Sequence, residues 1–215
     1  MIINNRIPYE YFITRGKGQS NIGSPGLPYE TGSYDGALKE AGIHNTNVLV
    51  YTSIIPKEAK EISRKEGISR IRFGEVMECI KAEANGKTGK TLSVAIIVSS
   101  VKDSKGHYLG SLASEYVNTF NTKKSENELV SNIEKSLLGS ISEMVKHRGY
   151  GNFIEKPQMY KDNYTDLGYV IHPGKDFIYD NLTVTEKYGS VLVAICFVSY
   201  KIKAKKIKKT KTIKK

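Results

Sequence analysis

Two adjacent hydroxyl side chains interrupt an otherwise apolar stretch near residue 50. Thr52 and Ser53 lie in the run Val48–Pro56, whose other residues are β-branched, aliphatic or aromatic up to the final proline. Such a run is typical of a buried strand that ends where proline removes a backbone donor. Taken alone, the two hydroxyls predict only side chains that satisfy nearby backbone groups. A serine is also a nucleophile when its surroundings activate it, so the neighbouring segments decide between these interpretations.

Two carboxylates are further candidates for chemistry. Asp35 falls in the first turn of a short predicted helix, which is capped by Ser33 and stopped by Gly42. There its ordinary role is to complement the helix dipole. Glu115 lies on the predicted strand Tyr108–Phe120, where its ordinary place is the wet face of the strand. The four histidines have no spacing typical of a metal site, so no metal is expected.

Several ordered motifs carry a resemblance to a known family. Asp-Gly-Ala-Leu at 35–38, Ala-Gly-Ile at 41–43, Asn-x-Asn at 45–47 and Thr-Ser-Ile-Ile-Pro-x-Glu-Ala at 52–59 occur in one dense stretch. This order closely resembles the self-cleavage region of the pyruvoyl-dependent arginine decarboxylases, in the bacterial branch with threonine before the cleaved bond. The segment 109–116 resembles the part that carries the family's catalytic glutamate, and 186–189 resembles the start of its final strand. The resemblance covers residues 7–200.

The resemblance implies that the chain is a zymogen that cleaves itself. The Ser53 hydroxyl would attack the Thr52 carbonyl carbon, and elimination from the resulting ester would yield a β chain of residues 1–52 and an α chain of residues 53–215. Serine is required, because only serine leaves a plain pyruvoyl group after elimination. The pyruvoyl group derived from Ser53 would then be the cofactor, without pyridoxal phosphate and without metal.

The resemblance also implies roles in decarboxylation. L-Arginine would form a Schiff base with the pyruvoyl group and leave as agmatine and carbon dioxide. The agmatine would feed polyamine synthesis, or the proton consumed by decarboxylation would provide acid resistance. Glu115 matches the family's general acid, Asp35 matches the carboxylate that binds the guanidinium, and Asn47 matches an asparagine that orients the reacting groups. The family's sites lie between subunits, so a homotrimer or a dimer of trimers is expected.

Charge and composition bound the remaining possibilities. Nine of the eleven net positive charges belong to the lysines of residues 201–215, so the charge indicates a disordered basic tail and no specific nucleic-acid partner. The longest apolar run, Val191–Val198, is too short to span a bilayer, and the expected location is cytoplasmic with no membrane partner. Cys79 and Cys196 are far apart in the sequence and are expected as buried residues in strands.

The elements that must position these residues predict an α/β (α+β) protein. Apolar strand patterns separated by polar turns are followed by a long helix with a capping box at Ser125–Glu128. Together with the resemblance they predict one domain over residues 1–200, built as a layered αββα sandwich with antiparallel or mixed central sheets. The predicted strands are 9–14, 48–56, 75–84, 92–100, 108–120 and 190–200, with a further strand near 168–171. The Gly/Ser-rich segment 16–26 is predicted as a loop that is either a flexible connection or an active-site cover.

Two other functions fit parts of the sequence. The first is a pyruvoyl-dependent decarboxylase of another amino acid such as aspartate, although Asp35 would repel an acidic substrate. The second is a non-catalytic protein that binds polyanions through its lysine tail. Self-cleavage separates the second of these from the enzymes.

Overall fold

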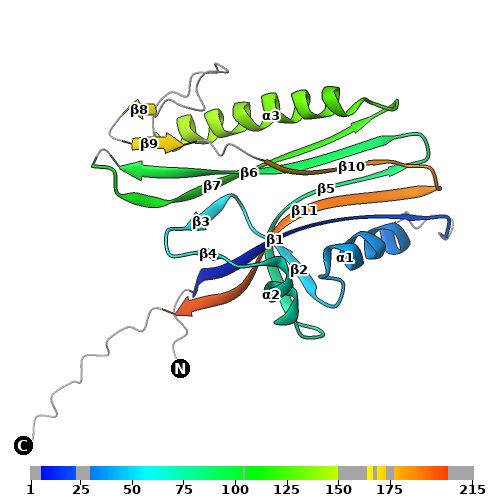
Figure 1. Ribbon diagram of the computed structural model, residues 1–215, viewed down its shortest axis with the longest axis horizontal. Helices are drawn as coiled ribbons and strands as arrows, with labels where there is room; N and C mark the ends of the chain where they lie inside the picture. The colour runs from blue at the N-terminus through cyan, green and yellow to red at the C-terminus, as the bar shows by residue number, and fades with distance from the viewer. Residues whose placement is uncertain are drawn as a thin grey trace, which may run out of the picture.

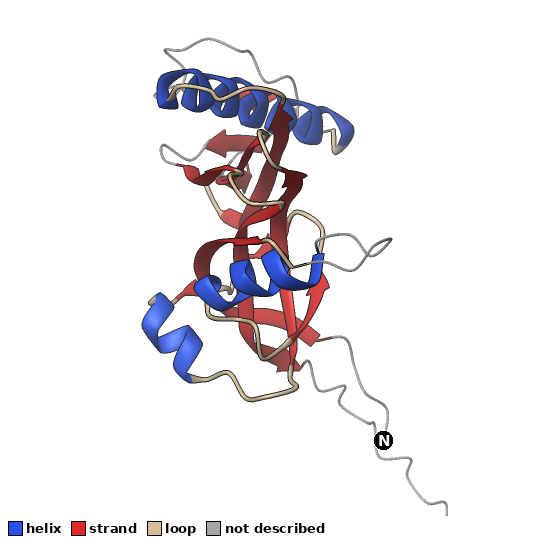
Figure 2. Cartoon of the chain, turned by 90° about the vertical axis from the view of Figure 1, so that its right-hand side faces the viewer, coloured by secondary structure: helices blue, strands red, loops and turns tan. Residues whose placement is uncertain are grey.

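The protein folds as four layers: helix, sheet, sheet and helix. The computed structural model describes residues 6–22, 30–103, 105–149, 164–166, 169–172 and 177–202, and in it two sheets pack face to face (Figure 1). Helix α3 (Glu126–His147) covers the outer face of one sheet, whereas α1 (Asp35–Ala41) and α2 (Arg64–Ser69) lie on the side of the other. Figure 2 shows the same order from the side. The predicted αββα sandwich is confirmed.

The lower sheet in Figure 1 has five strands in the order β2-β5-β11-β1-β4. They are β1 (Arg6–Ser20), β2 (Asn47–Val50), β4 (Lys60–Glu61), β5 (Val76–Lys87) and β11 (Tyr188–Ile202). The central strand β11 pairs antiparallel with β1 and β5, whereas β2 pairs parallel with β5 and β4 parallel with β1. The sheet is therefore mixed. β11 extends two residues into the segment that the sequence assigns to the tail.

The upper sheet has six strands, and every pairing in it is antiparallel. They are β3 (Ile54–Pro56), β6 (Thr91–Asp103), β7 (Tyr108–Phe120), β8 (Tyr164–Asp166), β9 (Tyr169–His172) and β10 (Phe177–Thr183). The order is β3-β7-β6-β9-β8, and β10 pairs with another part of β6. β3 and β2 are therefore edge strands of different sheets.

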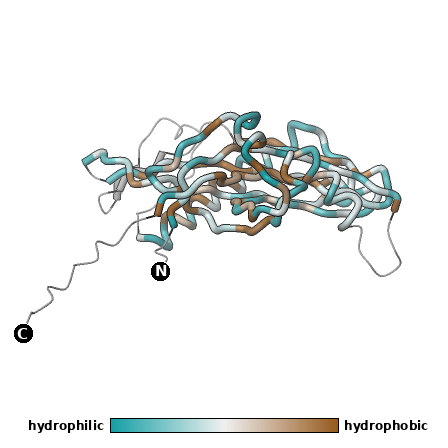
Figure 3. Tube along the Cα trace, turned by 90° about the horizontal axis from the view of Figure 1, so that it is seen from below, coloured by the Kyte–Doolittle hydropathy of each residue, from teal (hydrophilic) through white to brown (hydrophobic). Residues whose placement is uncertain are grey.

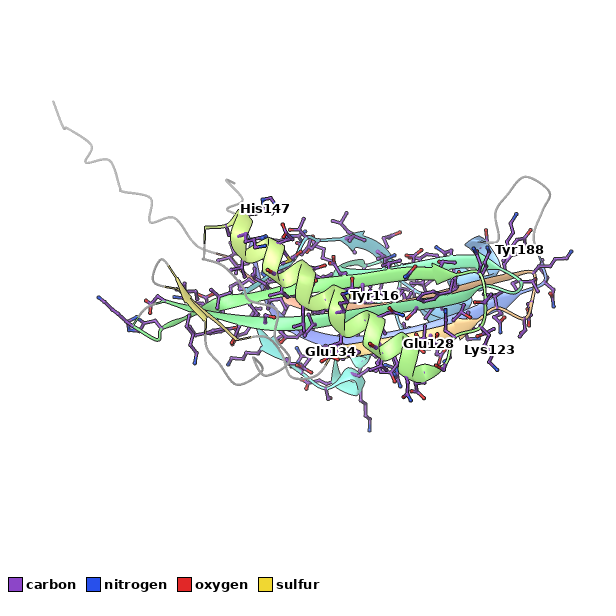
Figure 4. The ribbon with its side chains drawn as sticks, turned by 90° about the horizontal axis from the view of Figure 1, so that it is seen from above. Tyr116, Lys123, Glu128, Glu134, His147 and Tyr188 are labelled. Atoms are coloured by element: carbon purple, nitrogen blue, oxygen red, sulfur yellow. The ribbon has the colours of Figure 1, made fainter. Side chains whose placement is uncertain are left out.

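Three apolar clusters hold the layers together. One fills the space between the sheets around Ile80, Ile96 and Ile195, and a second lies under α3, where Ile133, Leu137 and Ile141 face the upper sheet. Figure 4 shows α3 crossing these strands with Tyr116 near it, and Figure 3 shows that hydrophobic residues gather along the middle of the strands. The third cluster lies under α1 and α2 and includes Cys79 and Cys196, which are directly opposite each other on β5 and β11. Both are free and buried, so the prediction that they are core residues in strands is confirmed.

The predicted capping box at the start of α3 is confirmed. The Ser125 hydroxyl accepts from the Glu128 backbone N–H, and the Glu128 carboxylate accepts from the Ser125 N–H at 3.0 Å. Both bonds occupy backbone donors that a helix start leaves unpaired. Among the described residues, no helix is long and apolar enough to cross a membrane.

Two local predictions at the N-terminal side are wrong. Residues 16–20 belong to strand β1 and not to a flexible loop, because the glycines there allow α1 to pack directly on the strand. A Cβ at Gly16 would lie 2.2 Å from the Ala37 carbonyl oxygen. Ser33 does not cap α1: it lies in a π-helical turn, η1 (Glu30–Tyr34), and its buried hydroxyl is 2.8 Å from that of Ser190. Residues 23–26 of the predicted loop lie outside the described residues.

Candidate functional site

The predicted strand Val48–Pro56 divides into two short strands that belong to different sheets. Tyr51 donates its N–H to the Cys79 carbonyl oxygen at 2.7 Å, the last bond of this segment to the five-stranded sheet. The Ser53 carbonyl oxygen accepts from the Ala113 N–H at 2.8 Å, its first bond to the six-stranded sheet. Thr52 lies between these two anchors. The prediction of one continuous buried strand is therefore wrong, because the chain changes sheets at the Thr-Ser pair.

Ser53 lies on the face of the upper sheet that looks into the molecule. Its neighbour two residues on, Ile55, is buried in the cluster between the sheets, and side chains two apart on a strand share a face. Ser53 itself is half-buried and Thr52 is exposed. Ser53 is therefore sheltered on one side but reachable from solvent.

Glu115 is close to Ser53 in the same chain. It follows Ala113, the bonding partner of Ser53, by two residues on β7 and shares its face. Such diagonal neighbours have Cα atoms about 7–8 Å apart. Glu115 is half-buried, and this desolvation raises the pKa of its carboxyl above the ordinary value. Glu115 therefore does not have the fully solvated environment that is ordinary for a glutamate on a strand, and its pKa is shifted in the direction that a general acid near neutral pH needs.

Asp35 lies on another layer of the molecule. It is exposed in the first turn of α1, two residues after Ser33, whose hydroxyl contacts Ser190 of β11. Ser190 pairs with Asn85 of β5. Asn85 is six residues along β5 from Cys79, whose carbonyl oxygen binds the Tyr51 N–H. Six strand residues span about 20 Å. Within one chain, Asp35 and Ser53 are therefore not brought together.

Asn47 is also separate from Ser53 within the chain. It begins β2, its backbone N–H donates to the Glu75 carbonyl oxygen, and its side-chain amide donates to the Gly74 carbonyl oxygen at 3.0 Å. Four strand residues, or about 13 Å, separate it from Tyr51. The structure thus brings Thr52, Ser53 and Glu115 together, but neither Asp35 nor Asn47.

An aromatic cluster that the sequence reasoning missed lies beside the crossing. The Tyr51 ring contacts Phe197 of β11, with centroids 5.8 Å apart, and both pack in the cluster between the sheets with Tyr200. Burial, together with the neighbouring Tyr51 hydroxyl, raises the pKa of Tyr200. A cavity of about 300 Å³ next to it is lined by Arg6, Arg70, Phe197 and Tyr200, among others. The aromatic position immediately before Thr52 was the available sequence signal.

Comparison with known proteins gives the same class. The sequence model of the pyruvoyl-dependent arginine decarboxylase family matches residues 10–202. The pyruvoyl-dependent arginine decarboxylases AaxB of Chlamydia caviae and of Chlamydia trachomatis serovar L2 are 31% and 32% identical in alignments of 184 positions, which cover 79% of this chain and 94% of each relative. A pyruvoyl-dependent arginine decarboxylase of Nitrosopumilus maritimus is 32% identical over 130 residues, 60% of this chain and 66% of that protein.

An αββα sandwich with a Thr-Ser crossing next to a half-buried glutamate is the framework of a pyruvoyl-dependent decarboxylase. The chain belongs to the pyruvoyl-dependent arginine decarboxylase family. Neither alternative function considered from the sequence is favoured by these matches. The residues around position 53 fit the family's cofactor, because a serine, the precursor of a pyruvoyl group, lies on an apolar face of the sheet near a carboxyl whose pKa is raised by burial.

Proposed function

We propose that the chain is a self-processing decarboxylase that converts L-arginine to agmatine and carbon dioxide. The observation that carries the proposal is that Ser53 is anchored at the sheet crossing with Glu115 as its neighbour on β7. One domain, residues 1–200, contains all the residues involved. The basic tail lies outside the described residues from residue 203 onward, and no role in the reaction is assigned to it.

Self-cleavage uses only groups of the chain. The Ser53 Oγ attacks the Thr52 carbonyl carbon, the C–N bond breaks, and the nitrogen takes the proton, so an ester replaces the amide. Loss of the Ser53 Cα proton then breaks the Cβ–Oγ bond and releases Thr52 as a carboxylate. Water hydrolyses the remaining dehydroalanine, ammonia leaves, and a ketone ends the new α chain. Backbone bonds to two different sheets hold both sides of the scissile bond while these groups react.

Decarboxylation needs an electron sink and a proton donor. The pyruvoyl carbonyl supplies the sink for the electrons left at Cα as carbon dioxide departs. Glu115 returns a proton to that carbon, because desolvation keeps its carboxyl protonated to a higher pH than usual. The inward face of the upper sheet, with Ile55 and Ala113 buried beside Ser53, excludes water from one side. Asn47 is not near Ser53 in its own chain, so in this proposal it orients the reacting groups of a neighbouring chain.

Substrate recognition requires a second chain. Asp35 can accept a guanidinium bidentately, but about 20 Å of strand separates its layer from Ser53 within one chain. This separation is no obstacle in an assembly in which Asp35 or Asn47 of one chain lies at the Ser53 of its neighbour. A trimer or a dimer of trimers would repeat this contact at every site by symmetry. The edge strands that meet at the crossing suit such a contact, because Leu49 and Val50 of β2 and Ile54 of β3 are exposed there.

The proposal is tested by comparing the wild-type chain with Ser53→Ala. On a denaturing gel and by intact mass, the wild type should appear as two chains, with the new α-chain terminus blocked and the β chain ending at Thr52. Ser53→Ala should remain whole and release no carbon dioxide from any amino acid, whereas the wild type should release it fastest from arginine. An intact, folded wild-type chain with an ordinary serine at position 53 would refute the proposal. Faster release from aspartate would refute the substrate.

A further inference from the structure

An ion pair between the buried Glu78 of β5 and the half-exposed Arg6 of β1 lies behind the crossing, and β5 is the strand that anchors Tyr51. Glu78 of β5 faces the space between the sheets, since its neighbours Met77 and Cys79 both point into the cluster under α1. Its side chain is 2% exposed, and its Oε1 accepts from the Arg6 guanidinium. Among the described residues, its Oε2 has no hydrogen-bond partner. Such a carboxylate costs folding free energy, so its presence in the core calls for an explanation other than stability.

Two contacts connect this pair to the residue before the scissile bond. The Arg6 guanidinium lies 4.8 Å above the centre of the Tyr200 ring, and Tyr200 packs with Tyr51 in the cluster between the sheets. Glu78 is also directly opposite Phe197 in the β5–β11 register, and the Phe197 ring contacts that of Tyr51. Glu78 is therefore linked to Tyr51 by two series of neighbours. One runs through Arg6 and Tyr200, and the other runs through Phe197.

We propose that Glu78 is a positioning residue for self-cleavage, which holds Arg6 on Tyr200 and thereby fixes Tyr51 and the Thr52–Ser53 peptide bond in the reactive orientation. This inference rests on the proposed function, because it concerns the same self-cleavage. Glu78 does not touch the reacting atoms and acts through Tyr51. A displacement of about 1 Å at the reacting groups is enough to slow a step about a hundredfold.

The test uses Glu78→Gln, which keeps the size of the side chain and removes the charge that holds the guanidinium. The full-length precursor is synthesised in a cell-free system, and samples are divided between a denaturing gel and brief proteolysis. The rate of cleavage is then measured only in chains already folded, as judged by protease resistance. Glu78→Gln is expected to slow this rate about tenfold to a hundredfold. A purely structural role would lower the folded fraction and leave the rate in folded chains unchanged.

Two further variants sharpen the comparison. Glu83→Gln is the matched control, since Glu83 lies on the same strand but on its other face and is paired with Lys81. It should cleave at the wild-type rate. Arg6→Gln should slow cleavage like Glu78→Gln, and the double variant should be no slower than either single variant, because both changes break one interaction.

The outcomes separate the two proposals. Folded Glu78→Gln that cleaves at the wild-type rate, or a double variant whose effects multiply, would overturn the role of Glu78 and leave self-cleavage intact. Equal slowing by Glu83→Gln would also overturn it. A folded wild-type chain that never cleaves would overturn both proposals together.

Discussion

Glu115 has a carboxyl group whose environment suits a proton donor. Half-burial on β7 raises its pKa, so the folded chain holds this proton more tightly than the unfolded chain does. A donor must be protonated, and decarboxylation should therefore decline as pH rises through the raised pKa. Glu115→Gln cannot give up a proton and should lower kcat about 10²–10⁴-fold while self-cleavage proceeds. Carbon dioxide release from about pH 5 to about pH 9, with a denaturing gel of the same samples, checks both statements.

The same shift predicts a change in stability with a definite sign. The pKa of Glu115 in the folded chain lies above its unfolded value of about 4.3. Ionisation of Glu115 therefore destabilises the fold as pH rises from the unfolded-state pKa through the folded-state pKa. Glu115→Gln removes this loss. The variant should match the wild type in free energy of unfolding at the acidic end and exceed it at neutral pH. A difference that is constant with pH would show that the carboxyl does not titrate differently on folding.

At the scale of elements, the sequence predicts most strands and the main helix but not which sheet each strand joins. Apolar runs separated by polar turns are local features, and β7 and the capped start of α3 follow from them directly. Val48–Pro56 is uniform in pattern, so nothing local indicates that it changes sheets at Thr52. That crossing depends on β5 and β7, which follow later in the chain. The proximity of Ser53 and Glu115 comes from the same long-range pairing.

The packing of α1 on β1 gives a prediction at this scale. Gly16→Ala would place a methyl group 2.2 Å from the Ala37 carbonyl oxygen, so α1 must move and carry Asp35 with it. Overpacking of this kind costs about 1–3 kcal/mol. The melting temperature should fall and KM for arginine should rise more than kcat falls. Lys17→Ala, at the next position of β1, is the control and should change KM little, because it removes only a partly exposed ion pair with Asp180 and a 3.5 Å hydrogen bond to the Asn181 carbonyl oxygen. Equal kinetics for both variants would contradict a role of α1 in placing Asp35.

For the whole molecule, the two halves of the proposed site lie in different layers of one chain. Ser53 and Glu115 are on the upper sheet at the crossing edge, whereas Asp35 is outside the lower sheet. No movement within a packed sandwich closes a separation of about 20 Å, because interiors packed at crystal density shift by far less. If both carboxylates serve one substrate, they must come from two chains. The exposed apolar edge strands at the crossing are the surface that such an assembly would cover.

Complementation between two inactive variants tests this arrangement. Asp35→Asn lacks the guanidinium partner and Glu115→Gln lacks the proton donor, so each alone should be nearly inactive while still cleaving at Ser53. When the two are co-expressed in equal amounts, random assembly gives about one site in four an intact Asp35 from one chain and an intact Glu115 from its neighbour. Activity per site should recover to about a quarter of the wild-type value.

A second pair of co-expressions identifies which chain supplies the pyruvoyl group, because each variant is mixed separately with Ser53→Ala. Asp35→Asn should be rescued by this uncleaved partner. Glu115→Gln should not be rescued, because Glu115 and Ser53 act from the same chain. No recovery in any mixture would show that each chain builds its site alone, and would require Asp35 to have no part in binding arginine.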